Sequence, residues 1–195
     1  MSIEDATEKR FEADIETALL SKQGGYTHNN DPYDAALGVY PATLVRFIQM
    51  TQAKEWTRFT MQNSGDVERK FCQAFNNACD RDGLLAVLRH GFKHRGLTFR
   101  VCYFQPESSL NQMSTELYKK NEITCNRQWY YSSSYQTSVD MVLAVNGIPV
   151  FAFELKNQYT GQNVENAKRQ WMYDRDAREI CFLFNKRILG YFCVD

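Results

Sequence analysis

The chain has 195 residues with equal numbers of acidic and basic side chains, and 44% of its residues are hydrophobic, which suits one globular domain with a sizeable core. This neutral balance lacks the basic excess of many nucleic-acid-binding proteins, although acidic residues gathered at a metal site would also lower the net charge. No apolar run approaches the roughly 20 residues of a membrane span and the acidic start has no signal-peptide core, so we expect a cytoplasmic chain without membrane contact.

Helical spacing dominates the first half of the chain. Phe11, Ile15 and Leu19 form an apolar stripe that predicts a helix, and Gly24-Gly25 end it. Similar stripes recur further along. The predicted helices cover residues 7–22, 41–52, a segment from residue 53, and 66–80.

The second half has mainly the alternating pattern of strands, with a helix capped by Asn163. The predicted elements are strands at 97–106, 123–131, 180–184 and 188–194, a strand pair at 138–156, a short helix within 111–122 and a helix over 163–174. This order predicts a single domain, residues 1–195, with an α/β fold and a mixed β-sheet flanked by helices on both faces. The basic segment 89–100 meets phosphates or is a solvated loop. The six cysteines lack CxxC spacing, so we interpret them as buried thiols.

The segment Ser138 to Lys156, SVDMVLAVNGIPVFAFELK, reads as a β-hairpin. Asn146-Gly147 suits a tight turn between two apolar runs, because both residues tolerate the positive φ that such a turn needs. Three charges interrupt the runs at the end away from the turn. Asp140 lies on the first strand, and Glu154 and Lys156 share one face of the second.

The register of this hairpin decides whether the two acids meet. A two-residue loop would place Asp140 opposite Phe153, on the wrong face. A three-residue loop, residues 146–148 with a Gly-type bulge, would set Asp140 directly across from Glu154. We favour the three-residue loop because it gathers all three charges at one end of one face, whereas the shorter loop scatters them.

Directly opposed carboxylates, with Cβ atoms about 5 Å apart, repel one another unless a cation lies between them. A hard divalent ion such as Mg²⁺ takes oxygen ligands, usually one or two carboxylates plus water and substrate phosphate. A neighbouring lysine can help to activate water or offset charge on a phosphate. Asp140 with Glu154-x-Lys156 therefore indicates a phosphodiester-cleaving site, and the alternative is an ordinary edge hairpin with a surface salt bridge.

The hairpin and the helix after it also carry a family resemblance. SVDMVLAVNGIPVFAFELKN followed by NVENAKRQWMYDRD resembles the N-terminal endonuclease domain of the restriction (motor) subunit of type I restriction–modification enzymes, within the PD-(D/E)xK nuclease superfamily. The similarity extends in the same order through FEADIETALLSKQGGY, LLAVLRHGFKHRG, RQWYYS and NKRILGYFCVD. It implies a restriction-endonuclease-like core and Mg²⁺-dependent hydrolysis of double-stranded DNA.

The resemblance implies roles for the acidic residues and the lysine. Asp140 and Glu154 would bind the metal, and Lys156 would be the catalytic lysine. Glu12 resembles the acid of the first helix that often completes such metal sites.

The resemblance also indicates residues that contact DNA. Gln170 looks like the glutamine of the family's Gln-x-x-x-Tyr motif, which acts beside the catalytic residues. Tyr173 follows it by three positions rather than four, which leaves the role of the tyrosine open. The predicted DNA-binding residues are Gln170, Tyr173, Arg127 and Lys168.

The family implies partners as well. Its chain continues into helicase-like motor domains that use ATP and works with methyltransferase and specificity subunits on double-stranded DNA. This sequence stops at Asp195 while still reading as a strand, so we expect a longer protein. Two alternatives stay open: a catalytically silent docking module of the same assembly, and a PD-(D/E)xK exonuclease or repair nuclease.

Overall fold

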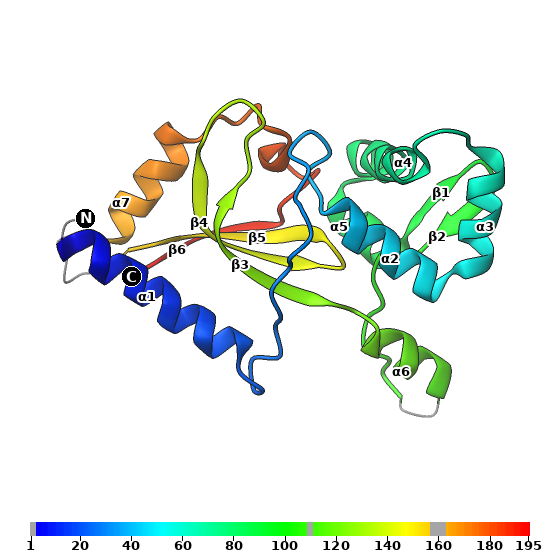
Figure 1. Ribbon diagram of the computed structural model, residues 1–195, viewed down its shortest axis with the longest axis horizontal. Coiled ribbons are helices and arrows are strands. Elements are labelled where there is room, and N and C mark those ends of the chain that lie inside the picture. Colours follow the sequence, from blue (N-terminus) through cyan, green and yellow to red (C-terminus); the bar gives the residue numbers. More distant parts are fainter. Residues whose placement is uncertain (1–2, 109–110, 157–162) are drawn as a thin grey trace.

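The computed structural model describes residues 3–108, 111–156 and 163–195, which form two adjoining regions (Figure 1). The sheet region contains the four strands β3 to β6 with helices α1 and α7. The helical region contains α2 to α5, a small hairpin of β1 and β2, and α6. The predicted α/β architecture, with a mixed sheet and helices on both faces, is confirmed.

The larger sheet has the order β3-β4-β5-β6. Its strands are β3 (Ile123–Tyr130), β4 (Ser138–Val145), β5 (Ile148–Leu155) and β6 (Gly190–Val194). The first three strands pair antiparallel, and β6 pairs parallel to β5. Because parallel neighbours need a crossover, the chain between β5 and β6 passes over one face of the sheet and carries a helix there.

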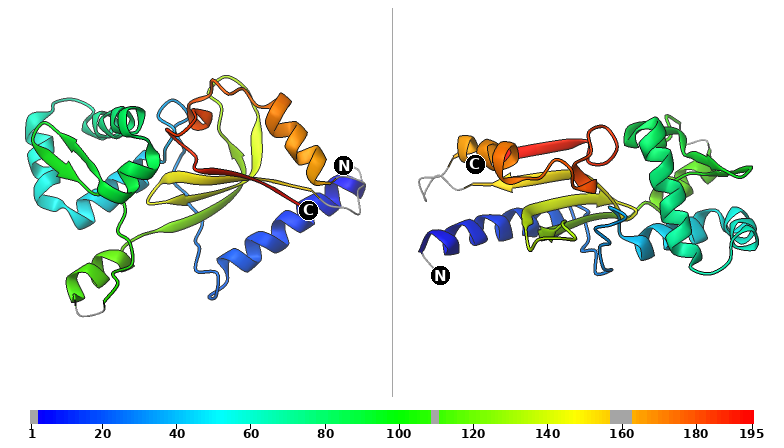
Figure 2. Two further views of the ribbon diagram at one scale, coloured as in Figure 1. Left: turned by 180° about the vertical axis from the view of Figure 1, so that it is seen from behind. Right: turned by 90° about the horizontal axis from the view of Figure 1, so that it is seen from above.

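The two faces of this sheet are covered by different helices, as the view from above shows (Figure 2). Helix α1 (Ile3–Leu20) lies on one face and presents Phe11, Ile15 and Leu19 to Met141 and Leu155. This is the stripe that the helical spacing predicts.

The other face is covered by the crossover. It contains α7 (Val164–Arg169), a π-helical turn η2 (Gln170–Asp174) and a 3₁₀ turn η3 (Ile180–Phe182). Trp171 and Phe182 from these turns pack on Val142 and Ala152. The predicted strand at 180–184 is therefore wrong, because Cys181 and Phe182 pack in an aromatic cluster and the segment does not pair with the sheet.

The helical region surrounds a core of aromatic side chains. Its elements are α2 (Pro41–Thr51), α3 (Ala53–Gln62), α4 (Val67–Asp82), α5 (Leu84–His90), β1 (Phe92–His94), β2 (Leu97–Phe99) and α6 (Gln112–Lys119). Phe71 lies at the centre, with its ring within 5.7 Å of the rings of Trp56, Phe59, Phe92 and Phe99. The strand predicted over 97–106 is shorter than expected, and the basic segment forms the β1–β2 hairpin rather than a plain loop.

The turn between β4 and β5 inserts its tip into the helical region. The side-chain amide of Asn146, which is fully buried, donates to the carbonyl oxygen of Val101 at 2.9 Å and accepts from the backbone of Glu122 at 2.8 Å. The carbonyl oxygen of Gly147 accepts from the backbone N–H of Tyr40, just before α2, at 2.8 Å. The two regions are therefore joined through the hairpin that carries the predicted site.

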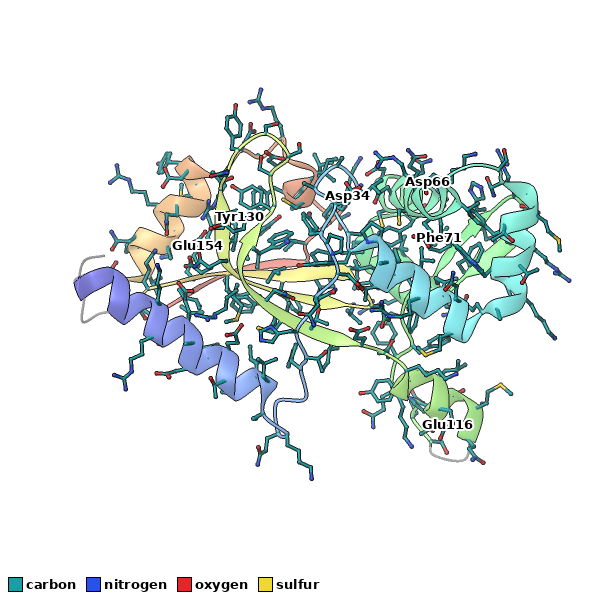
Figure 3. All side chains as sticks on the ribbon, in the orientation of Figure 1. Asp34, Asp66, Phe71, Glu116, Tyr130 and Glu154 are labelled. Atoms are coloured by element: carbon teal, nitrogen blue, oxygen red, sulfur yellow. The ribbon has the colours of Figure 1, made fainter. Side chains whose placement is uncertain are left out.

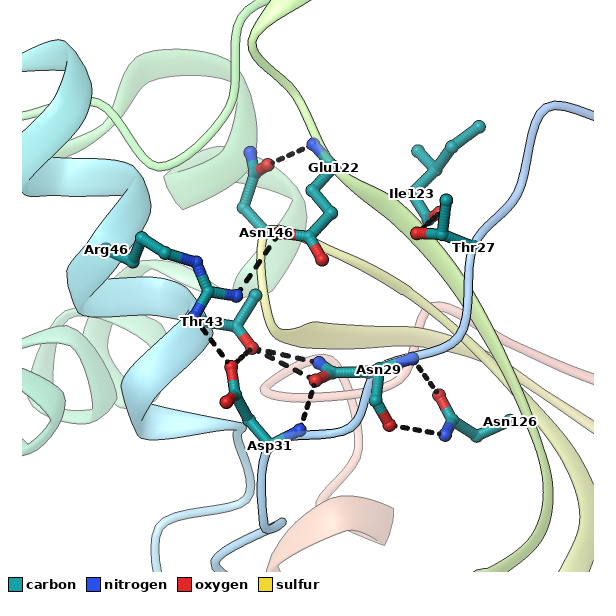
Figure 4. A network of polar contacts seen from close by, with 9 residues as sticks. All are labelled: Thr27, Asn29, Asp31, Thr43, Arg46, Glu122, Ile123, Asn126 and Asn146. Carbon is teal, nitrogen blue, oxygen red and sulfur yellow. Dashed lines mark hydrogen bonds and ion pairs between the residues drawn. The ribbon is translucent and has the colours of Figure 1, made fainter.

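A second polar network ties α2 to the edge strand β3 (Figure 4). Thr43 of α2 donates to Asp31 at 2.6 Å, and Arg46 forms an ion pair with the same carboxylate at 2.9 Å. Asn29, two residues earlier, donates to Thr43 and accepts through its backbone oxygen from Asn126 of β3. The connector between α1 and α2 is thus held on both regions.

The six cysteines are free thiols; Cys72, Cys79, Cys125 and Cys181 are buried as predicted, whereas Cys102 and Cys193 are partly exposed. Burial raises the pKa of Cys72 and of Cys79 to about 12, which makes both poor nucleophiles. None of the helices in the described part of the chain is both long and apolar enough to cross a membrane.

Candidate metal-dependent nuclease site

The β4–β5 hairpin brings the two predicted acids together by a route that differs from the expected one. Val145 pairs with Ile148, so the loop has two residues, and the predicted three-residue loop is wrong. Asn146 and Gly147 both have positive φ, 51° and 79°, as a tight hairpin turn requires. Taken alone, this turn would put Asp140 on the wrong face.

A bulge in β5 restores the predicted alignment. Leu143 pairs with Phe151 but Ala144 pairs with Pro149, so Val150 is an extra residue on β5. Beyond the bulge Met141 pairs with Phe153, which sets the next position, Asp140, across from Glu154. The predicted meeting of the two acids holds, and its cause is a bulge within the strand rather than a longer loop.

Asp140 and Glu154 interact directly at the end of these strands. Glu154, labelled in Figure 3, is fully buried and, like Ala152 two residues earlier, lies on the face of the sheet that carries α7. The pKa of Glu154 is raised to about 7, first by burial and then by repulsion from Asp140, while Arg175 opposes the shift. One oxygen of Asp140, Oδ2, accepts from the backbone N–H of Leu155 at 2.7 Å. Two carboxylates are therefore held together at a cost that a bound cation would remove.

Arg175, which follows η2, forms an ion pair with Glu154. Its Nε donates to Oε1 of Glu154 at 3.1 Å, and its Nη2 donates to the same oxygen. The other oxygen, Oε2, is buried and finds no hydrogen-bond partner among the described residues. The sequence gives no signal for this contact, which joins residues 21 positions apart.

Lys156 completes the predicted trio at the end of β5. Only 6% of its surface is exposed, and its backbone N–H donates to the carbonyl oxygen of Val194 in β6 at 2.7 Å. A buried lysine two residues after Glu154 shares its side of the strand. The parallel partner strand β6 thus fixes the backbone of the lysine next to the two acids.

Gln170 begins the π-helical turn η2 on the same face of the sheet. Its side-chain oxygen is buried and finds no hydrogen-bond partner within the described residues. Tyr173 has a different environment, with 72% of its surface exposed. The wider turn of a π-helix separates positions three apart, which agrees with the different environments of Gln170 and Tyr173. Their contact with DNA stays a prediction.

Glu12 of α1 lies on the α1 side of the sheet, against β3. The amide of Gln128 donates to both of its oxygens, at 3.2 and 3.0 Å, and Arg127 lies 3.8 Å away. Gln128 has a φ of 49° and lies between Arg127 and Trp129, which pair with Met141 and Val139, so it is level with Asp140. No sequence signal marks Gln128, since a positive φ is uncommon for glutamine.

Two of the predicted DNA contacts are cations that already have acidic neighbours. Arg127 forms an ion pair with Glu16 at 2.7 Å in addition to its contact with Glu12. Lys168 is exposed on α7 and pairs with Glu165 one turn earlier. Both lie at the surface next to the site, and their part in binding DNA stays a prediction.

The donor set suits a divalent ion held by two carboxylates. Within the described residues no three His, Cys, Asp or Glu side chains come together as a metal cluster, so Glu12 does not join Asp140 and Glu154 in this structure. The unpartnered Oε2 of Glu154, beside a second carboxylate, is the arrangement that fits Mg²⁺, which keeps several waters and takes few protein ligands.

Comparison with known families identifies the chain. The family model for the N terminus of the type I restriction enzyme R protein matches residues 7–192, nearly the whole sequence. The chain belongs to this family. Searches of the curated proteins and of the solved structures gave no match. The N-terminal R-protein family is the one that the hairpin and the following helix resemble in sequence.

Proposed function

We propose that this R-protein domain is a Mg²⁺-dependent endonuclease that hydrolyses phosphodiester bonds of double-stranded DNA. One observation carries the proposal: a bulged hairpin sets Asp140 across from Glu154, with Lys156 two residues further on and buried. Holding a buried carboxylate and a buried lysine beside a second carboxylate costs stability, so a role in chemistry explains the arrangement better than a role in folding.

Each residue has a distinct part in this proposal. Asp140 and Glu154 would hold the ion through Oδ and Oε atoms, and the ion, when bound, would supply positive charge that activates water and offsets negative charge on the phosphate. Lys156 would place its ammonium where negative charge grows on the phosphate oxygens. Gln170, at the start of η2, would orient the DNA strand with its free side-chain oxygen.

A groove of about 730 Å³ between α1 and β3 offers a surface for the DNA backbone. Lys9, Arg10 and Arg127 line it, together with Glu12, Glu16 and Gln128. Cations along such a groove can contact phosphates without reading sequence. We therefore propose that sequence recognition and translocation come from the specificity and methyltransferase subunits and from ATP-using motor domains.

The test compares cleavage and metal binding in matched variants. We expect Lys156→Met to lower plasmid cleavage by about 100-fold or more while retaining Mn²⁺ binding, because the lysine acts on the phosphate and not as a ligand. We expect Asp140→Ala to lose both properties. Lys54→Met, an exposed lysine of α3, is the control and should change neither.

Cleavage is measured with the domain carried in its assembled enzyme, and metal binding by calorimetry on the domain. Normal cleavage by Lys156→Met would refute the proposed chemistry. A wild-type domain that binds no Mn²⁺ or Mg²⁺ would favour a docking module instead.

A further inference from the structure

Arg175 uses two of its donors on a single oxygen of Glu154. Its Nε lies 3.1 Å from Oε1, and its Nη2 donates to the same atom. A guanidinium usually bridges both oxygens of a carboxylate, one donor to each. Here Oε2 is left over, buried and without a hydrogen-bond partner in the described residues.

The guanidinium is fixed by more than this ion pair. Its Nη1 donates to the hydroxyl oxygen of Tyr131 at 3.4 Å, and its centre lies 5.6 Å from the ring of Tyr131 and 5.9 Å from the ring of Trp171. Only 10% of the Arg175 side chain is exposed. Releasing Oε1 would leave a buried guanidinium and a buried carboxylate unpaired, which is costly.

The second carboxylate is restricted in a similar way. Oδ2 of Asp140 accepts from the backbone N–H of Leu155 at 2.7 Å, inside the sheet. The protein thus occupies one oxygen of each acid. An ion between Asp140 and Glu154 would meet one oxygen from each rather than two.

This restriction separates two common divalent ions. Mg²⁺ demands near-octahedral geometry at about 2.0–2.1 Å and is satisfied by single carboxylate oxygens and waters. Ca²⁺ takes about 6–8 oxygens at longer distances and commonly binds carboxylates through both oxygens. A site in which the second oxygen of each acid is already held favours the smaller ion.

We propose that Arg175 determines the metal selectivity of the site, by holding Oε1 of Glu154 so that this acid is a one-oxygen ligand that accepts Mg²⁺ or Mn²⁺ in preference to Ca²⁺. The inference rests on the proposed function, since it requires an ion at Asp140 and Glu154. Arg175 is a positioning residue in this account and touches neither the ion nor the DNA.

The experiment measures the ratio of Ca²⁺ affinity to Mn²⁺ affinity by calorimetry, with the Mn²⁺ spectrum recorded by electron paramagnetic resonance. Arg175→Met removes the donors and keeps a side chain of comparable length. We expect the preference for Mn²⁺ over Ca²⁺ to fall by about tenfold, the scale seen for residues that support metal ligands. Losing a positive charge favours all divalent ions alike, so the ratio isolates the geometric effect.

Arg178→Met is the matched control, because Arg178 lies three residues further on and its side chain is 90% exposed. Its ratio should equal that of the wild type. Arg175→Lys keeps the charge but cannot place two donors on one oxygen, so we expect an intermediate ratio. If circular dichroism shows that Arg175→Met is unfolded, the affinity ratio of Arg175→Lys tests the proposal instead.

The outcomes separate the two proposals. If the wild-type domain binds no divalent ion, the proposed function fails and the inference with it. If the wild type binds Mn²⁺ at Asp140, but Arg175→Met and Arg175→Lys keep the wild-type ratio or weaken both ions equally, only the inference about selectivity is overturned.

Discussion

The helical region and the sheet region differ in what they bury. The core of the helical region is built from Phe59, Phe71, Phe75 and Phe99, each fully buried. The sheet region buries Glu12, Glu154 and Lys156, and Figure 3 shows Glu154 far from Phe71. Apolar burial stabilises a fold and buried charge opposes it. The apolar core of the helical region therefore stabilises the fold, whereas the buried charges of the sheet region oppose folding.

Irregular backbone follows the same division. In the sheet region β5 is bulged, η2 is a π-helix, and Gln128 has a positive φ. The helical region has regular α-helices, with Asp66 accepting from the backbone of Arg69 at the start of α4, and a non-glycine residue with positive φ at Arg95 in the β1–β2 turn. Strained or unusual backbone persists where function requires a particular geometry, so the irregular region is the one to test for chemistry.

The largest expected effect separates the two regions. Phe71→Ala removes a fully buried ring that contacts four others, so we expect a loss of about 3–5 kcal/mol in the free energy of unfolding. Urea denaturation measures it. Mn²⁺ affinity under native conditions should stay unchanged, because the ring does not support the site. Phe184→Ala, at a 94% exposed ring, is the control and should be nearly neutral. Loss of metal binding in folded Phe71→Ala would mean that the regions are not independent.

A change at the hairpin turn should affect both regions together. A Cβ at Gly147 would lie 2.7 Å from the carbonyl oxygen of Tyr40, and the backbone has a φ of +79°. We expect Gly147→Ala to cost about 2 kcal/mol or more and to weaken metal binding, since both backbones must shift. Gly65→Ala is the matched control: it has a φ of +76° with open space around it. Equal losses in the two variants would show that the turn does not press on α2.

The smallest expected effect is a pH dependence of stability caused by the buried charge of Glu154. The pKa of Glu154 is about 7 in the folded chain against an ordinary 4.5, so the folded state binds this proton more tightly than the unfolded state. Its contribution to stability is complete below the ordinary value and is lost as the pH rises through about 7. Asp140→Asn removes one cause of the shift. The stability of this variant relative to the wild type should therefore rise as the pH increases from about 5 to about 8.

The measurement is the difference in unfolding free energy between Asp140→Asn and the wild type at the two pH values. Asp174→Asn, at an exposed aspartate, serves as the control and should show a constant difference. A difference for Asp140→Asn that does not grow with pH would argue that the two carboxyl groups do not repel each other.

The parts of the fold that sequence could predict are those set by local periodicity. The stripe of Phe11, Ile15 and Leu19 predicts α1 and its buried side, and the patterns for α2 to α4 are correct within a few residues. The strand predicted over residues 180–184 was wrong because a short apolar run is ambiguous between strand and turn until its tertiary contacts are known.

The residues of the candidate site could be predicted from the sequence, but the backbone features that bring them together could not. Asp140 and Glu154 do meet, yet the bulge at Val150 has no marker in the apolar run that contains it. Arg175 and Gln128 act through contacts between distant segments, which periodicity cannot report. The offset of Tyr173 from Gln170 was visible in the sequence, but its meaning depends on the π-helical turn.

The bulge at Val150 separates two tasks that a simple hairpin would combine. The tight turn is dictated by its fit against α2, whereas the alignment of Asp140 with Glu154 depends on the total number of residues between them. Deleting Val150 alone would turn Glu154 to the other face of the sheet. Adding one residue at the turn as well would restore its alignment with Asp140. The turn could thus change in length while the two acids stay opposed, provided that each residue inserted at the turn is matched by a deletion at the bulge.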